Sequence, residues 1–178
     1  MPRLVVLTGA SGSGKTTLAK ALAAQREPGI DVLFFDSIGV PPAEQMISEF
    51  GSGEAWQRAK AIDWMKRVAQ IMRTGTNVVL EGQMRIRFVE EAIASADIAD
   101  ARIILVDCAD DVRDRRLMGD RAQPALASAT MTDWARFLRD EARRGRHEVL
   151  DTTELAPGAC VERIRDYIRS ADKSEKTA

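Results

Sequence analysis

Residues 9–16 read Gly-Ala-Ser-Gly-Ser-Gly-Lys-Thr, and this stretch decides the fold of the 178-residue chain. It fills every fixed position of the pattern Gly-x-x-x-x-Gly-Lys-Ser/Thr, the phosphate-binding loop or P-loop. The apolar run at residues 4–7 precedes it and is typical of a parallel strand buried on both faces. Leu18, Ala21 and Leu22 follow at helical spacing. The motif therefore lies between a strand and a helix, which is the setting that a P-loop requires.

The chemistry of this loop is phosphate binding. Successive backbone N–H groups can surround phosphate oxygens, and the start of the following helix adds its positive end. We expect Lys15 to reach the β- and γ-phosphates, the Thr16 hydroxyl to bind Mg²⁺ and Thr17 to fix the α-phosphate side. A chance match of the fixed positions is expected in on the order of one chain in a hundred. We therefore predict ATP and Mg²⁺ as ligands, and the expected nucleotide-binding residues are Gly9, Ser11, Gly12, Ser13, Gly14, Lys15, Thr16 and Thr17.

Composition indicates one globular unit. Hydrophobic residues make up 45% and charged residues 30% of the chain, and its net charge is −1. This balance gives no electrostatic reason to expect nucleic acid or a membrane as partner. We find no signal-peptide pattern and no apolar run of membrane-spanning length, so we expect a cytoplasmic monomer or homodimer. Cys108 and Cys160 are too few for a disulfide framework. We predict a single domain over residues 1–171 and a polar tail over residues 172–178.

Short apolar runs alternate with helical patterns along the chain. Strand-like runs lie at residues 4–7, 32–35, 78–80, 103–106 and 149–150. Helical patterns cover residues 15–25, 54–73, 88–93 and 134–144, and a last helix begins near Pro157. A loop is expected after residue 37. This alternation predicts an α/β fold with helices on both faces of a five-stranded parallel sheet.

Several features together resemble the small P-loop kinases. They are Gly-Ala-Ser-Gly-Ser-Gly-Lys-Thr-Thr at residues 9–17, an acid after the second strand, Glu81-Gly82 after the third, an arginine-rich segment after the fourth and Leu-Asp-Thr-Thr-Glu-Leu at residues 150–155. The group includes gluconate, shikimate and adenylylsulfate kinases and chloramphenicol phosphotransferase, with the nucleoside monophosphate kinase-like fold. The resemblance implies a three-layer P-loop fold with strand order 2-3-1-4-5 and a mobile, arginine-bearing lid at about residues 113–130. No single member is identified.

Asp36 follows the second strand directly. Ligands of open α/β sheets bind at the carboxyl ends of the strands, so this carboxylate is expected to face the acceptor. It could accept the proton of an acceptor hydroxyl. By resemblance, Phe35-Asp36-Ser37 matches the site of the base in chloramphenicol phosphotransferase. The alternative is a loop Asp that caps the next helix.

Other charged residues are candidates for the metal and the acceptor. Glu81 ends the third strand beside the P-loop and is expected to bind Mg²⁺, unless it only pairs with a nearby arginine. Arg85 and Arg87 lie at a helix start, where cations oppose the helix dipole, and this placement indicates an anionic group on the acceptor. The alternative is two solvated arginines.

Residues 113–146 contain nine arginines, five acids and no lysine, so this window carries +4. Guanidinium groups fork onto phosphate oxygens and stack on adenine. We therefore expect Arg116 and Arg121 to be catalytic lid residues, and Arg116 also to bind the nucleotide. The alternative is a solvated helix face paired with Asp114 and Asp120. The arginines from residue 136 onward alternate with acids and predict a solvated face without a role. By resemblance, Thr152 borders the adenine.

These residues predict an ATP-dependent kinase. It would transfer the γ-phosphoryl group to a hydroxyl, or a phosphate, of a small-molecule acceptor. One alternative is a nucleoside or nucleotide kinase in which Arg85 and Arg87 hold an acceptor phosphate. Another is an ATP-hydrolysing regulatory protein, because the P-loop alone does not distinguish transfer to an alcohol from transfer to water.

Overall fold

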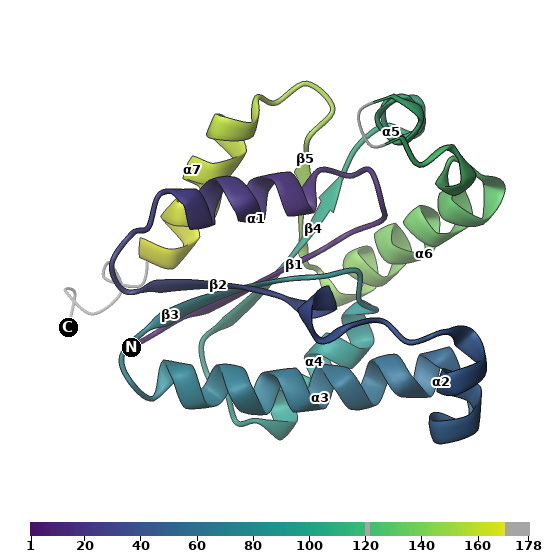
Figure 1. The fold of residues 1–178 in the computed structure, drawn as a ribbon. Coiled ribbons are helices and arrows are strands. Elements are labelled where there is room, and N and C mark those ends of the chain that lie inside the picture. Colours follow the sequence, from purple (N-terminus) through teal and green to yellow (C-terminus); the bar gives the residue numbers. More distant parts are fainter. Residues whose placement is uncertain (120–121, 170–178) are drawn as a thin grey trace.

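The computed structural model describes residues 1–119 and 122–169. Their centre is a parallel sheet of five strands in the order β2-β3-β1-β4-β5 (Figure 1). The strands are β1 (Leu4–Thr8), β2 (Ile30–Phe34), β3 (Asn77–Glu81), β4 (Ala101–Asp107) and β5 (Glu148–Asp151). The predicted α/β fold and strand order are both confirmed.

Helices cover both faces of the sheet, which gives three layers (Figure 1). One face carries α1 (Lys15–Ala24) and α7 (Pro157–Arg169), and the other carries α3 (Gly53–Met72), α4 (Ile86–Ser95) and α6 (Ala129–Gly145). Successive side chains of a strand point to opposite faces. Accordingly Val5 and Leu7 enter the core beneath α1 and α7, whereas Leu4 and Val6 enter the core beneath α3 and α4. Burial on both faces explains why β1 is apolar at consecutive positions.

The strand register brings the carboxyl ends of three strands together. Glu81, the last residue of β3, lies beside Leu7 of β1 on one side and Phe34 of β2 on the other. The loops that follow these strands therefore begin at one edge of the sheet. This edge carries the P-loop, the turn with Asp36 and the Glu81 carboxylate.

The segment after β2 is more regular than predicted. The 3₁₀ turn η1 (Phe35–Ile38) follows β2 at once, and helix α2 (Ala43–Phe50) begins after Pro42. Ala43, Met46, Ile47 and Phe50 recur at helical spacing, but the helix has only eight residues and none of them is fully buried, so its apolar pattern is shorter than that of α3. The prediction of a plain loop after residue 37 was wrong for this reason.

The arginine-rich segment forms helix α5 (Asp110–Met118), followed by a short 3₁₀ turn, η2 (Pro124–Leu126). Arg121 and the predicted tail at residues 172–178 lie outside the described residues. Across residues 1–119 and 122–169, the helices are all too short or too polar to cross a membrane.

Candidate active site

The loop between β1 and α1 depends on glycine where space is smallest. A Cβ atom at Gly9 would lie 2.2 Å from the carbonyl oxygen of Val106, and one at Gly12 would lie 2.8 Å from Cγ of Arg113. Gly12 also has φ +82°, a left-handed conformation that favours glycine. The backbone N–H of Ser13 donates to the carbonyl oxygen of Ala10 at 3.2 Å and closes the turn. The Ser13 Oγ is buried and has no hydrogen-bond partner among the described residues, as expected of a hydroxyl that meets a phosphate.

Three predicted side chains converge at the start of α1. The Thr16 hydroxyl donates to Oε1 of Glu81 at 2.9 Å, and Nζ of Lys15 lies 4.0 Å from the same oxygen. Lys15 and Glu81 are both buried, so each charge compensates the other in a site of low polarity. A hydroxyl and a carboxylate are oxygen ligands of the kind that Mg²⁺ prefers. The predicted metal ligands Thr16 and Glu81 thus lie together, and they fit a magnesium ion.

A cavity of about 410 Å³ opens beside the P-loop. Its volume suits a small ligand. Polar groups of the loop line it together with Leu155, Pro157 and Cys160. Its P-loop residues include Gly12, Gly14, Lys15, Thr16 and Thr17, and both Arg116 and Thr152 also line it. The cavity therefore combines groups that can bind phosphate with apolar side chains.

Arg116 and Thr152 contact each other and the P-loop. Arg116 donates through Nη1 to Oγ1 of Thr152 at 2.9 Å and through Nη2 to the Thr152 carbonyl oxygen at 2.8 Å. The Thr152 hydroxyl in turn donates to the Ser13 carbonyl oxygen at 2.8 Å. The two residues predicted to meet the nucleotide are therefore joined directly to the loop that precedes α1.

Asp36 lies on the exposed turn η1, two residues beyond the end of β2. Its carboxylate does not cap the next helix, because the N-cap residue of α2 is Pro42 and no side chain among the described residues caps this helix. Buried Phe35 anchors the turn: its carbonyl oxygen accepts a hydrogen bond from Nε1 of Trp64 at 3.2 Å. A Cβ atom at Gly82 would lie 2.4 Å from Cβ of Phe35, so the turn sits tightly against the chain after β3.

A second cavity, of about 560 Å³, lies between the turn and helices α2 and α3. Its aromatic wall is formed by Phe50, Trp56 and Trp64, and both tryptophans also belong to the core. The cavity borders the segment that follows Asp36, since residues 38–41 line it.

Arg85 and Arg87 face carboxylates of the chain itself. Both pair with Glu54, with Nη2 of Arg85 at 3.3 Å from Oε2, and Nε of Arg87 lies 3.8 Å from Oε1 of Glu141. The Arg85 guanidinium also lies over the Trp134 ring, 5.1 Å from its centroid. Neither alternative from the sequence describes them fully, because both arginines are held by acids and one is stacked on an aromatic ring.

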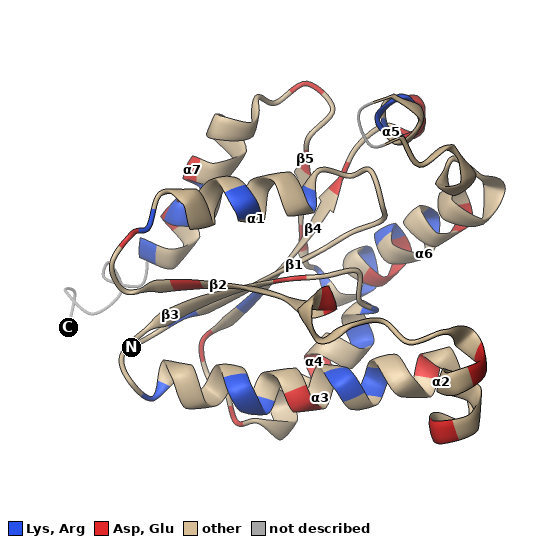
Figure 2. Ribbon diagram, in the orientation of Figure 1, with Lys and Arg blue, Asp and Glu red and all other residues tan. Residues whose placement is uncertain are grey.

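The prediction of a solvated face without a role was wrong for two residues of α6. Basic and acidic residues follow one another along this helix (Figure 2). Glu141 is buried, and its Oε2 accepts the backbone N–H of Ile86 at 2.7 Å at the start of α4. Arg139 donates to Asp107, at the end of β4, and to Asp110. These hydrogen bonds, that with Asp107 above all, raise the pKa of the Arg139 guanidinium above its ordinary value. The exposed Arg136, Arg143 and Arg144 agree with the prediction.

The pKa values near the loop follow from these contacts. The hydrogen bond from Arg139 lowers the pKa of Asp110 most, and Arg113 lowers it further. Burial raises the pKa of the Cys108 thiol, which points its Sγ at the Gly12 carbonyl oxygen, 3.9 Å away. Cys108 is thus a free, buried thiol.

Comparisons with known proteins agree with this fold and site. The sequence pattern of the family described as AAA domain matches residues 5–135. A protein of Citrifermentans bemidjiense called "Nucleotide-binding protein" is 32% identical over 157 residues, covering 86% of this chain and 49% of the relative. A nucleotide-binding protein of Geobacter sp. strain M21 is 31% identical over 157 residues, which again cover 86% of this chain and 49% of the relative. The chain therefore spans about half the length of the curated relatives it matches.

Solved structures share the fold at low sequence identity. Shikimate kinase from Acinetobacter baumannii, in complex with shikimate, superimposes with a TM-score of 0.64 at 16% identity, over 97% of this chain and 96% of that chain. A gluconokinase from Sinorhizobium meliloti 1021 superimposes with a TM-score of 0.60 at 17% identity, over 94% of this chain and 90% of that chain. The resemblance to small P-loop kinases is thereby confirmed at the level of the fold.

Proposed function

This chain belongs to the AAA domain family, and we propose that it is an ATP-dependent phosphotransferase acting on a hydroxyl group of a small-molecule acceptor. The observation that carries the proposal is that Lys15, Thr16 and Glu81 converge at one edge of the sheet. Strand β2 ends at the same edge, and Asp36 follows it. Phosphoryl transfer depends mainly on alignment and charge neutralisation, and this edge supplies groups for both.

Each of these site residues has its own role in the proposed phosphoryl transfer. The acceptor oxygen forms a bond to the γ-phosphorus, the bond from that phosphorus to the β–γ bridging oxygen breaks, and ADP leaves with that oxygen. Asp36 takes the proton of the attacking hydroxyl. Lys15 neutralises charge on the β- and γ-phosphates, and Arg116 on α5 also neutralises phosphate charge. Mg²⁺, held by Thr16 and Glu81, would supply further neutralisation of the developing charge.

The pairing of Arg85 and Arg87 favours a hydroxyl acceptor over a phosphate. Glu54 and Glu141 already neutralise these guanidinium groups, so an acceptor phosphate would have to displace a carboxylate. A nucleotide kinase is therefore supported less well than a kinase for a neutral alcohol. A cytoplasmic location would provide the ATP that this reaction consumes.

A regulatory ATP-hydrolysing protein is the second candidate. One observation favours it: the curated relatives are called nucleotide-binding proteins, and this chain spans only about half of their length. In that case water would take the place of the alcohol at the same edge of the sheet.

Release of ADP from ATP·Mg²⁺ in the presence of different acceptors tests the proposal. The panel should contain sugars, nucleosides, nucleotides, and aminoglycoside and phenicol alcohols. We expect release that depends on one class of alcohol. Steady hydrolysis that no acceptor changes would instead support the second candidate.

Asp36→Asn tests the assigned base. Since general-base catalysis contributes about 10²- to 10⁴-fold, we expect transfer to fall by about that factor while ATP binding persists. The matched control is Asp31→Asn, which removes an exposed carboxylate near the start of β2 and should leave transfer unchanged. Full transfer by Asp36→Asn would show that another group takes the proton.

A further inference from the structure

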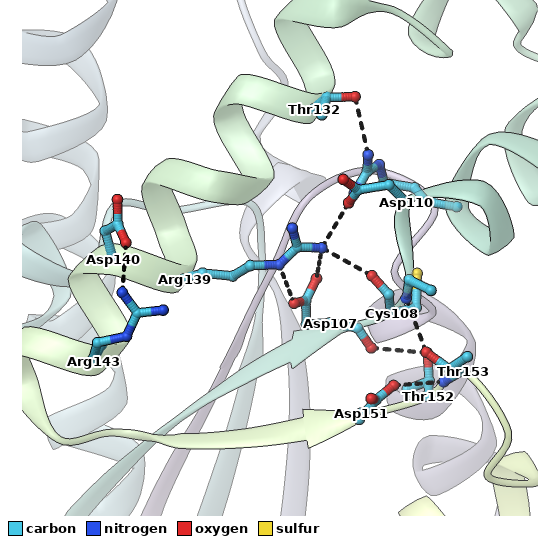
Figure 3. A network of polar contacts seen from close by, with 12 residues as sticks. Asp107, Cys108, Asp110, Thr132, Arg139, Asp140, Arg143, Asp151, Thr152 and Thr153 are labelled. Atoms are coloured by element: carbon cyan, nitrogen blue, oxygen red, sulfur yellow. Dashed lines mark hydrogen bonds and ion pairs between the residues drawn. The ribbon is translucent and has the colours of Figure 1, made fainter.

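Arg139 makes four hydrogen bonds to residues from the end of β4 to the start of α5, all through its Nε and Nη2 (Figure 3). Its Nε donates to Oδ2 of Asp107 at 2.5 Å and its Nη2 to Oδ1 of the same residue at 3.2 Å. Nη2 also donates to the Cys108 carbonyl oxygen at 3.0 Å and to Oδ1 of Asp110 at 2.7 Å. One side chain of α6 therefore fixes both the end of β4 and the first turn of α5.

Asp110 joins this arginine to a second one. The oxygen that accepts from Arg139 also accepts from Nη1 of Arg113 at 2.8 Å, and Nη2 of Arg113 donates to the Thr132 hydroxyl on α6 at 3.2 Å. Two arginines and two aspartates thus form a cluster without net charge between α5 and α6. Charge-assisted hydrogen bonds of this kind are strong, and the loss of one partner leaves a poorly compensated charge.

Helix α5 in turn lies directly against the P-loop. A Cβ atom at Gly12 would meet Cγ of both Arg113 and Leu117, at 2.8 and 3.0 Å. Arg116 lies one turn after Arg113 and contacts Thr152 beside the nucleotide cavity. A rotation or shift of α5 would therefore move the guanidinium group of Arg116 and the backbone of Gly12 together.

Helix α6 provides a fixed support for the cluster. Its inner face, with Ala135, Leu138 and Ala142, is buried in the core. Its Glu141 carboxylate accepts the Ile86 N–H at the start of α4. Because α6 is held at these points, Arg139 links α5 to a helix that is anchored in the core.

We propose that Arg139 is a positioning residue for nucleotide binding: through Asp107 and Asp110 it sets the position of α5 and hence that of Arg116. The inference rests on the proposed function, in which Arg116 contacts the nucleotide. It assigns a role to a side chain that itself does not line the cavity beside the P-loop.

A double-mutant cycle tests this role, because coupled residues give non-additive effects. The variants are Arg139→Gln, Arg116→Gln and the two together, and calorimetry measures their affinity for ATP·Mg²⁺. We expect each single change to weaken binding about tenfold, and the double variant to bind within about twofold of Arg116→Gln. The matched control is Arg143→Gln, one turn further along α6. Among the described residues, exposed Arg143 pairs with Asp140, and its variant should bind like the wild type (Figure 3).

Two results would overturn the inference while leaving the proposed function intact. In one, Arg139→Gln binds ATP·Mg²⁺ as tightly as the wild type. In the other, the two changes add, as expected if Arg139 only stabilises the fold. A wild type that does not bind ATP·Mg²⁺ would overturn the proposed function and this inference with it.

A second variant keeps the test decisive if circular dichroism shows that Arg139→Gln does not fold. Asp110→Asn removes the charge that both arginines share while it preserves the size of the side chain. It should show the same non-additivity with Arg116→Gln, and additivity would overturn the proposal. Asp111→Asn, which pairs with exposed Arg115, is its control.

Discussion

Gly12 shows how one residue of the loop combines two constraints. Its φ of +82° costs a residue with a Cβ about 1–2 kcal/mol, and the close approach of Arg113 adds a steric cost. We expect Gly12→Ala to lower the free energy of unfolding by more than the backbone cost alone. Urea denaturation measures this loss.

Gly29→Ala is the matched control for Gly12→Ala. Gly29 has φ +80°, but nothing lies within 4 Å of its Cβ position, so this variant experiences only the backbone cost. The difference between the two variants isolates the contact with α5. Equal losses of stability would mean that the contact between α5 and Gly12 adds no steric cost to Gly12→Ala.

Individual site residues differed in how far the sequence could predict them. Lys15 and Thr16 follow from the motif, and Glu81 follows from its place at the end of a strand beside the motif. Arg139 could not be predicted, because the carboxylate that a helix arginine meets depends on how helices pack. Glu141 did carry a signal: it lies three residues after Leu138, on the face that turns toward the core.

At the scale of elements, the Asp110 cluster should make stability sensitive to acid. Its arginine partners hold the pKa of Asp110 below its ordinary value, about 3.9 in unfolded chains. Such a depressed pKa stabilises the fold above that pH, and this stabilisation disappears as the pH falls through the folded-state pKa. We expect Asp110→Asn to reduce stability at pH 6 and to make its decline below about pH 4 shallower.

Urea denaturation between pH 6 and pH 3 measures this dependence. The control is Asp111→Asn, whose carboxylate is exposed and pairs with an exposed arginine on the same helix. An acid profile of Asp110→Asn parallel to that of the wild type would show that the cluster does not couple protonation to folding.

The elements themselves were predicted well where apolar residues repeat strongly. The five strands and the helices that cover them have unbroken apolar runs or stripes, and these patterns fixed their order along the chain. Helix α2 was missed because its apolar pattern covers only eight residues and directly follows the turn signal Pro41-Pro42. The lid prediction covered residues 113–130, but its first part is a helix with Arg113 fully buried, a placement that arginine composition does not reveal.

For the whole molecule, the order of the strands determines which residues can act together. β1 lies between β3 and β4, so the P-loop has Glu81 on one side and Asp107 on the other. Under the proposed function, Asp36 contributes to the acceptor side through β2, and Thr152 contributes to the nucleotide side through β5. The nucleotide groups and the acceptor groups therefore meet at the loop that follows β1.

Calorimetric titration with ATP in the presence of Mg²⁺ tests this arrangement most directly. The wild type should bind, and Lys15→Ala should bind about tenfold to a hundredfold more weakly, because a charge-assisted contact contributes about 1.5–3 kcal/mol. Lys66→Ala, an exposed lysine on α3, should bind like the wild type. A wild type that binds no purine triphosphate, or a Lys15→Ala variant that binds as tightly, would contradict the account.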